Sequence, residues 1–228
     1  MNDTRPTDVD FWFDPVCPWT WLTSRWMLAV RETRPVEITW HVMSLAVLNE
    51  GRLDQLPPQN RDLMSRAWAP VRVLIAAQEA FGPGVLEPLY TALGTRYFLR
   101  DQPKTPGVIR EALRETGLPE DLAAAGDTDS HDAALRRSHQ EGIDLVGQSV
   151  GSPIIAIPDG DEGGGRIAFF GPVVNPTPTG EEAARLWDGI VTVASISGFY
   201  EIKRTRTSAP IFGHLTSAHR PRRARLGT

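Results

Sequence analysis

The sequence is poor in the groups on which disulfide-linked, membrane-spanning and nucleic-acid-binding proteins depend. Its 228 residues include one cysteine, Cys17, which excludes an internal disulfide framework. No run of about 18 apolar residues occurs, so no membrane span is predicted. The first ten residues, MNDTRPTDVD, lack the apolar stretch of a secretory signal, and a cytoplasmic location is the expectation. The net charge of −4 gives no reason to expect nucleic acid or an acidic membrane surface as a partner.

Recognisable cofactor motifs are also missing. The five histidines show no metal-ligand spacing with Cys17, so no metal is predicted. The glycine-rich stretch GDEGGG follows one predicted strand but precedes another, which is typical of a hairpin turn rather than of a phosphate-binding loop. We therefore expect no tightly bound nucleotide.

The first 45 or so residues change hydrophobic period twice. Residues 9–13 alternate between apolar and other side chains and predict a strand, which Asp14-Pro15 ends. Residues 18–30 carry apolar side chains at four-residue steps and predict a helix. Residues 36–42 alternate again. A strand–helix–strand order implies a parallel pair of strands joined by a crossover helix.

The remainder of the chain predicts helices followed by a hairpin and one more helix. A loop is expected at 50–60, then helices within 64–75, 86–93, 105–117, 118–125 and 130–147. Strands are expected at 154–157 and 166–170. Thr179 and Glu182 have the spacing of a capping box that opens the final helix.

This order, βαβ, about ninety residues of helix, then ββα, is that of a thioredoxin fold of the α/β class with an inserted all-helical subdomain. We assign 8–50 and 148–205 to the thioredoxin-like domain and 51–147 to the helical insertion. Residues 206–228 are expected to be a flexible basic tail, because no acidic residue occurs from Lys203 to Thr228. A nucleic-acid-binding arm is the alternative interpretation of that tail.

Cys17 falls where the first strand meets the first helix. Pro18 suits the first helical position, which places the sulfur at the N-cap. Backbone N–H groups there lack intrahelical partners, and the helix dipole is positive. Both effects favour thiolate, so we expect the pKa of Cys17 to fall below its ordinary value of about 8.5. The alternative is that Cys17 packs as a small buried hydrophobe.

Thr20 stands three residues after Cys17, where a dithiol site would carry its second cysteine. Its hydroxyl could donate a hydrogen bond to a thiolate, or it could bond locally to the backbone. A threonine cannot resolve a mixed disulfide, so a redox cycle at this site needs an external thiol.

Ser152-Pro153 stands immediately before the predicted strand at 154–157. Residues alone favour a trans proline that opens the strand. A cis bond would instead turn the Ser152 backbone outward, toward an extended thiol substrate.

Several long stretches resemble a known family. CPWTW after a strand, the helical insert and GSPIIAI resemble the DsbA-like branch of the thioredoxin superfamily. DFWFDPVCPWTWLTSRW, HVMSLAVLNE, RAWAPVRV and FFGPV followed by LWDGIVTVAS are more closely similar to the actinobacterial mycothiol-dependent nitroreductases. The similarity spans roughly residues 9 to 206.

The resemblance implies roles for individual residues. Cys17 corresponds to the nucleophile and Pro153 to the cis-proline that faces it. Pro18, Ser152 and Pro153 would contact the thiol cofactor. The residues that would line an aromatic substrate pocket are Trp19, Trp21 and Asn49, the last in the loop after HVMSLAVL. Core packing is the alternative for the two tryptophans, and a turn position is the alternative for Asn49.

Thr20 departs from the CPWC motif usual in that family, and it leaves a monothiol route. The resemblance thus implies a cytoplasmic monothiol oxidoreductase in which Cys17 and mycothiol, or a similar thiol, reduce a small electrophile, an aromatic compound or a mixed disulfide. One alternative is a transferase or isomerase of the kappa-class glutathione transferase type, with no net redox. Another is a non-catalytic binding relative. A homodimer and a lid motion of the insert are left open.

Overall fold

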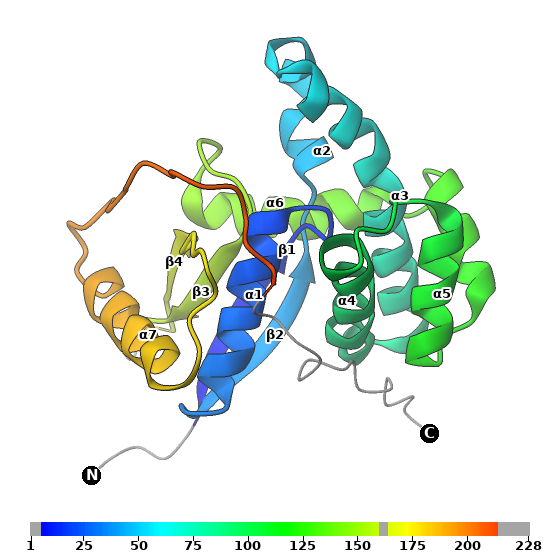
Figure 1. Ribbon diagram of the computed structural model, residues 1–228. Helices are drawn as coiled ribbons and strands as arrows, with labels where there is room; N and C mark the ends of the chain where they lie inside the picture. The colour runs from blue at the N-terminus through cyan, green and yellow to red at the C-terminus, as the bar shows by residue number, and fades with distance from the viewer. Residues whose placement is uncertain (1–5, 160–163, 214–228) are drawn as a thin grey trace.

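A computed structural model of the chain describes residues 6–159 and 164–213 (Figure 1). The first unit contains β1 (Thr7–Phe13), α1 (Pro18–Arg31) and β2 (Val36–Val42). The helical segment contains α2 (Leu45–Asn49), α3 (Pro58–Phe81), α4 (Leu86–Gly94), α5 (Pro106–Thr116) and α6 (Asp132–Val146), with shorter helical turns η1 (Glu50–Gln55), η2 (Pro83–Val85), η3 (Thr95–Leu99) and η4 (Glu120–Asp127). The last unit contains β3 (Ile154–Pro158), β4 (Arg166–Phe170) and α7 (Gly180–Ala194).

The strands of the described residues form one mixed sheet in the order β2-β1-β3-β4. β1 runs parallel to β2, with Phe11 opposite Trp40, and antiparallel to β3, with Phe11 opposite Ile155. β3 and β4 form the antiparallel hairpin predicted from the sequence. Together with the helices that cover the sheet, this topology confirms the predicted thioredoxin fold.

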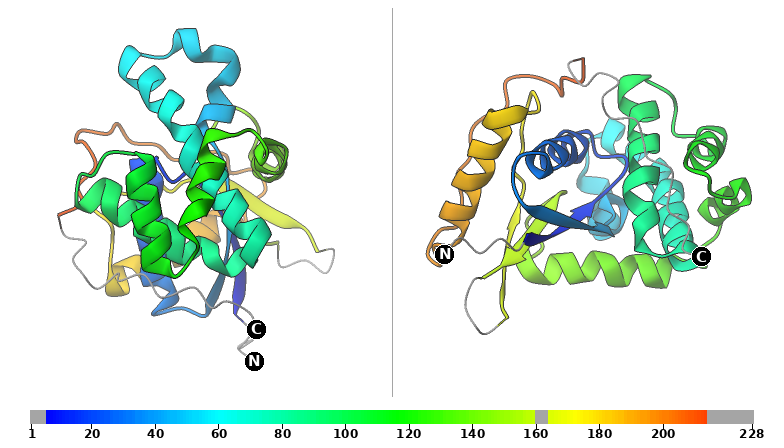
Figure 2. Two further views of the ribbon diagram at one scale, coloured as in Figure 1. Left: turned by 90° about the vertical axis from the view of Figure 1, so that its right-hand side faces the viewer. Right: turned by 90° about the horizontal axis from the view of Figure 1, so that it is seen from below.

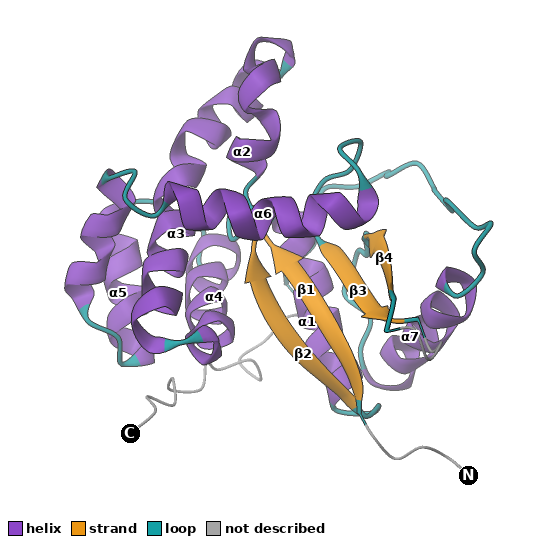
Figure 3. Ribbon diagram, turned by 180° about the vertical axis from the view of Figure 1, so that it is seen from behind, coloured by secondary structure: helices purple, strands orange, loops and turns teal. Residues whose placement is uncertain are grey.

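Helices cover both faces of the sheet. α1 and α7 pack on one face, and α6 crosses the other (Figures 2 and 3). On the α6 side the Trp12 indole is buried and its Nε1 donates to the Ser138 carbonyl oxygen at 3.0 Å. Gly142 of α6 makes this approach possible, because a Cβ there would lie 2.9 Å from the indole ring. A strand covered on both faces buries side chains that alternation alone would place outward.

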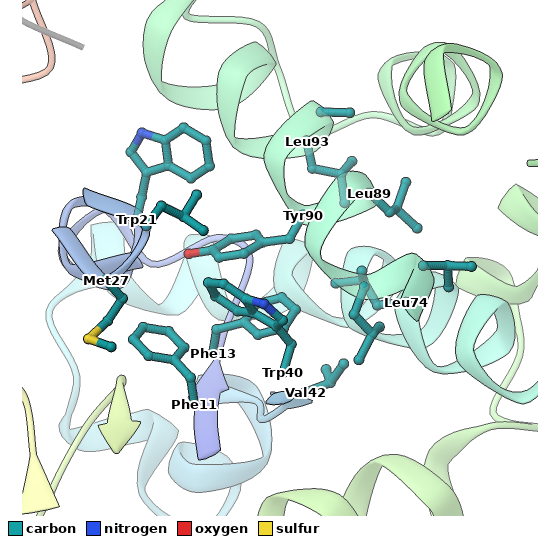
Figure 4. Packing of buried hydrophobic residues seen from close by; sticks show 14 of the residues in the cluster. Phe11, Phe13, Trp21, Met27, Trp40, Val42, Leu74, Leu89, Tyr90 and Leu93 are labelled. Carbon is teal, nitrogen blue, oxygen red and sulfur yellow. The ribbon is translucent and has the colours of Figure 1, made fainter. Parts of the chain in front are cut away.

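The helical segment shares the core of the sheet through α4 (Figure 4). The Tyr90 ring stacks on Phe13 with centroids 4.0 Å apart and meets the edge of Trp21 at 5.6 Å. Gly94 lies against Trp21 so closely that a Cβ would come within 2.1 Å of a ring carbon. The insertion predicted at 51–147 is helical throughout its described elements, and it is packed into the same hydrophobic core as α1 and β1.

Two local predictions were wrong. The loop expected at 50–60 is mostly helical, because η1 occupies Glu50–Gln55 and α3 begins at Pro58; with α2 these turns form an arm that projects from the body (Figure 1). Thr179 has N-cap backbone geometry, but its side chain makes no capping hydrogen bond, so the capping box is not formed.

The contact between Gly94 and Trp21 predicts a large effect of one added methyl group. Gly94→Ala should lower the free energy of unfolding by about 1–3 kcal/mol, the usual cost of overpacking a core. Gly189→Ala is the matched control, because Gly189 lies in α7 and a Cβ added there would meet nothing within 4 Å, so alanine should stabilise the helix by up to about 1 kcal/mol. Urea unfolding measures both. Equal stability of the two variants would contradict the packing argument.

Candidate active site around Cys17

Cys17 is the N-cap of α1, and Pro18 is its first residue, as the sequence predicts. The Cys17 N–H donates to the Asp14 carbonyl oxygen at 3.2 Å, which closes the turn between β1 and α1. The thiol faces Ser152, whose carbonyl oxygen lies 3.9 Å from Sγ. Pro18 is half-buried beside it, whereas Cys17 itself is only 6% exposed.

The predicted residues Thr20, Ser152 and Pro153 gather at the sulfur. The Ser152–Pro153 peptide bond is cis, as the resemblance implied. The Ser152 hydroxyl lies 2.7 Å from the Thr20 hydroxyl, and both side chains are buried. Residue 152, which lies just before β3, therefore presents a carbonyl to Cys17 and a hydroxyl to Thr20.

Asp14 is a site residue that sequence reasoning missed. Its side chain is fully buried, and its two carboxylate oxygens accept hydrogen bonds from the Val16 N–H at 2.8 Å and from the Leu45 N–H at 2.6 Å. Its own N–H donates to the Ser152 hydroxyl at 3.1 Å. Asp14 thus joins the cysteine turn, the start of α2 and the cis-proline loop. The only signal in the sequence was an aspartate followed by proline, which indicated a strand end.

The predicted depression of the Cys17 pKa is wrong for this conformation. Burial raises the pKa of Cys17, and hydrogen bonds from the Thr20 hydroxyl and from the Thr20 and Trp19 backbone oppose this rise without cancelling it. The nearby Asp14 charge raises it further. Burial also raises the pKa of Asp14 to about 6, against the two backbone hydrogen bonds that lower it. Loss of hydration outweighs the helix-tip donors, so the resting form is the thiol.

The three residues proposed to line a substrate pocket differ in their surroundings. Trp21 is 0% exposed, with the Arg25 guanidinium 4.0 Å above its ring, which supports the core-packing alternative. Trp19 is half-buried at the surface of α1. Asn49 is the last residue of α2, not part of a loop; its Nδ2 donates to the Leu45 carbonyl at 2.7 Å and its Oδ1 accepts from Arg52 at 3.0 Å.

Residues 206–213, the described part of the predicted tail, pack against the body near α1. The Arg206 guanidinium lies 5.0 Å from the Trp19 ring centroid, and Phe212 stacks on Phe98 at 5.4 Å. The Asn175 amide anchors the segment by donating to the Ser208 hydroxyl and the Ala209 carbonyl and by accepting from the Ile211 N–H. The rest of the predicted tail, 214–228, lies outside the described residues.

Two other features are absent from the part of the chain that the structure describes. No group of three or more histidine, cysteine, aspartate or glutamate side chains there is arranged to hold a metal ion. None of the helices found there has both the length and the apolar character needed to span a bilayer.

Comparison with known proteins points to one family and one fold. Residues 16–204 match the sequence profile described as Rv2466c-like, mycothiol-dependent nitroreductase Rv2466c. The uncharacterized protein Rv2286c of Mycobacterium tuberculosis is 30% identical over 210 residues, covering 90% of this chain and 85% of that protein.

Solved structures share the fold at low sequence identity. A protein disulfide isomerase-like structure from Nitrosomonas europaea has a TM-score of 0.54 at 13% identity, covering 82% of this chain and 98% of that one. The cytosolic disulfide reductase DsbM of Pseudomonas aeruginosa has a TM-score of 0.53 at 15% identity, covering 81% and 98%. The DsbA-type protein SCO1869 of Streptomyces coelicolor has a TM-score of 0.51 at 16% identity, covering 89% and 95%.

The buried Asp14 carboxyl predicts a pH-dependent contribution to stability. Its pKa is about 6 in the folded protein against 3.8 as the ordinary value, so folding favours the protonated form. Its contribution is therefore lost as pH rises from about 4 to about 6, by an amount on the order of 3 kcal/mol. Asp14→Asn removes this titration. The stability of wild type minus that of the variant, from urea unfolding at several pH values, should fall over that window; a flat difference would contradict the burial argument.

The Asn175 anchor predicts local protection of residues 206–213. Asn175→Ala removes three hydrogen bonds to the segment, and hydrogen exchange at the Ile211 amide should accelerate by about tenfold or more. Ser195→Ala is the control, because among the described residues that hydroxyl donates to the Thr192 carbonyl at the end of α7, and the change should leave exchange at Ile211 unchanged. Unchanged exchange in Asn175→Ala would show that the amide does not hold the segment.

Proposed function

This chain belongs to the family of the mycothiol-dependent nitroreductase Rv2466c, a family of thiol-dependent oxidoreductases, and we propose that it is a cytoplasmic monothiol oxidoreductase that works with an external low-molecular-weight thiol. The observation that carries the proposal is the placement of Cys17. Its sulfur faces the Ser152 carbonyl beside the cis-proline, and Thr20 occupies the position of a resolving cysteine.

The chemistry we propose is two thiol–disulfide exchanges. The Cys17 thiolate attacks a mixed disulfide between a substrate thiol and mycothiol, forms a Cys17–mycothiol disulfide and releases the substrate as its thiolate. A second mycothiol thiolate then attacks this disulfide, which releases oxidised mycothiol disulfide and regenerates Cys17. The net reaction converts the mixed disulfide and one free mycothiol into the substrate thiol and mycothiol disulfide, and no second protein cysteine is needed.

Residues near the sulfur would have separate roles in these two exchanges. Pro18 and Pro153 flank Cys17 and would contact the bound thiol, while the Ser152 backbone would align it. The Thr20 hydroxyl would stabilise the Cys17 thiolate, both when it attacks and when it leaves.

Two further residues would contact the substrate. Trp19, the half-buried tryptophan of the motif, would contact an aromatic or other small electrophile. Asn49 lies one helical turn beyond Leu45, whose N–H donates to Asp14. We propose that Asn49 faces the substrate from the arm.

The identity of the thiol rests on the family name. A member of this fold, DsbM of Pseudomonas aeruginosa, has also been solved with glutathione, which shows that this fold accommodates a tripeptide thiol in that protein. Burial raises the pKa of Cys17 in this conformation, which disfavours the reactive thiolate. Reaction therefore requires that water or polar groups of the bound thiol reach the sulfur. The thiol would therefore supply part of the polarity that ionises Cys17.

Transferase or isomerase chemistry is the second candidate. A site with one cysteine and a Thr20–Ser152 hydroxyl pair can bind and ionise an external thiol without exchanging disulfides. Formation of a thioether product with no mycothiol disulfide would favour this candidate.

Thr20→Cys separates the monothiol mechanism from its alternatives. When wild type reacts with mycothiol disulfide, intact mass should show a Cys17–mycothiol adduct that persists until free mycothiol is added. In Thr20→Cys the new thiol should resolve that adduct and leave an intramolecular disulfide, because cysteines at this spacing on a helix tip can pair. Cys17→Ser is the control and should form no adduct. Absence of an adduct in wild type would sink the redox proposal and leave the transferase or binding alternatives.

A further inference from the structure

The Ser152 side chain lies at the centre of a buried hydrogen-bond network that the proposed thiol exchange does not itself require. Its Oγ accepts the Asp14 N–H at 3.1 Å and lies 2.7 Å from the Thr20 Oγ1. The Asp14 and Thr20 side chains are 0% exposed and Ser152 is 4% exposed. In a buried network of this kind each hydroxyl proton needs an acceptor. The direction of each hydrogen bond therefore follows from the number of donors and acceptors that each group offers.

A serine hydroxyl has one proton to donate and can accept two hydrogen bonds. The Asp14 N–H is a donor only, so it uses one acceptor position on Ser152. If Thr20 donated to Ser152, the Ser152 proton would have no acceptor among the hydrogen bonds that the described residues make. If Ser152 donates to Thr20, the Ser152 hydroxyl uses its proton and accepts the Asp14 N–H. The Thr20 hydroxyl then accepts from Ser152, and its own proton can bond to another group. A buried unsatisfied donor is costly, which favours the second arrangement.

We propose that Ser152 is a positioning residue that, through its hydrogen bond to Thr20, aims the Thr20 proton at the Cys17 sulfur. This inference rests on the proposed function of Cys17 as a nucleophile. The two polar groups of residue 152 then act in different protonation states of the cysteine. In the thiol form the sulfur proton is directed at the Ser152 carbonyl, 3.9 Å away. In the thiolate form that donor is gone, and the Thr20 hydroxyl oriented by Ser152 supplies a proton to the sulfur.

The arrangement gives Thr20 a defined role at the position where a dithiol site carries its second cysteine. Thr20 lies three residues along α1 from Cys17, so its side chain is on the same face of the helix as the sulfur. A free threonine hydroxyl in a helix readily turns back to bond a backbone carbonyl of the preceding turn. The Ser152 proton occupies an acceptor position on Thr20 and fixes its oxygen on the β3 side. The Thr20 proton is thereby available to the sulfur.

Other charged or titratable groups around Cys17 come from several elements. Asp14 precedes α1 and its charge raises the Cys17 pKa. Besides burial, the charge of Cys17 raises the pKa of Tyr90 on α4, and the charge of Lys104, which precedes α5, lowers the pKa of Asp14. Arg206 lies over Trp19. Removing the Ser152 hydroxyl keeps these side chains in place but also takes the acceptor from the Asp14 N–H, so the effect of Ser152→Ala is compared with those of Thr20→Val and the double variant.

The test is the rate of alkylation of Cys17 by iodoacetamide as a function of pH, in wild type, Ser152→Ala, Thr20→Val and the double variant. Because Cys17 is the only cysteine in the chain, every labelling event reports on it. A lost hydrogen bond to a thiolate predicts that each single variant reacts about tenfold more slowly near neutral pH, with the apparent pKa raised by about one unit. The double variant should react no more slowly than Thr20→Val, since Ser152 acts only through Thr20.

Ser152→Thr retains the hydroxyl and should restore both the rate and the pH profile, which distinguishes positioning from a general packing defect. Thermal melting identifies any variant that fails to fold, and the comparison of Ser152→Thr with wild type then carries the test. Multiplicative slowing in the double variant, or an unchanged pH profile in Ser152→Ala, would overturn the proposal. Iodoacetamide labelling needs no mycothiol, so this result stands apart from the success or failure of the mixed-disulfide experiment.

Discussion

The buried carboxylate of Asp14 is the interaction on which the geometry of the site depends. It binds backbone N–H groups of Val16 and Leu45, and so fixes the turn that carries Cys17 against the first residue of α2. The Asp14 N–H at the same time holds the Ser152 hydroxyl. Three segments distant in sequence therefore meet at one residue. Because this group is dehydrated, its bonds are strong when made and costly when lost, and the three segments are expected to move together.

Dehydration also explains why a sulfur at a helix tip is not ionised at rest. Unpaired amides and the helix dipole favour the thiolate, but the surrounding side chains exclude the water that would stabilise it. A site built in this way holds its cysteine as an unreactive thiol until polar groups arrive. In the monothiol mechanism that we propose, this is a chemical advantage, since a permanently exposed thiolate would be open to oxidation without a partner cysteine to rescue it.

The resemblance implied a motif with two cysteines, and Thr20 is the residue at which this chain departs from that expectation. The threonine keeps a polar group at the position of the second sulfur, and Ser152 pairs with it across the gap between α1 and β3. Residues 206–213 lie past the end of the region matched by the family and bring Arg206 and Phe212 to the flank of the motif helix, against Trp19 and Phe98.

Local patterns in the sequence determined the strand–helix–strand unit, the terminal hairpin and the N-cap position of Cys17, because hydrophobic period and proline placement depend on neighbours only a few residues apart. The fold and the resemblance together also identified Thr20, Ser152 and Pro153. Tertiary structure alone decided the rest. Trp21 is a core residue because Gly94 of α4 lets it approach, and Asp14 is a structural anchor because Leu45 and Ser152 reach it. The direction of the Cys17 pKa shift depended on how much water the whole assembly excludes, a quantity that no short stretch of residues specifies.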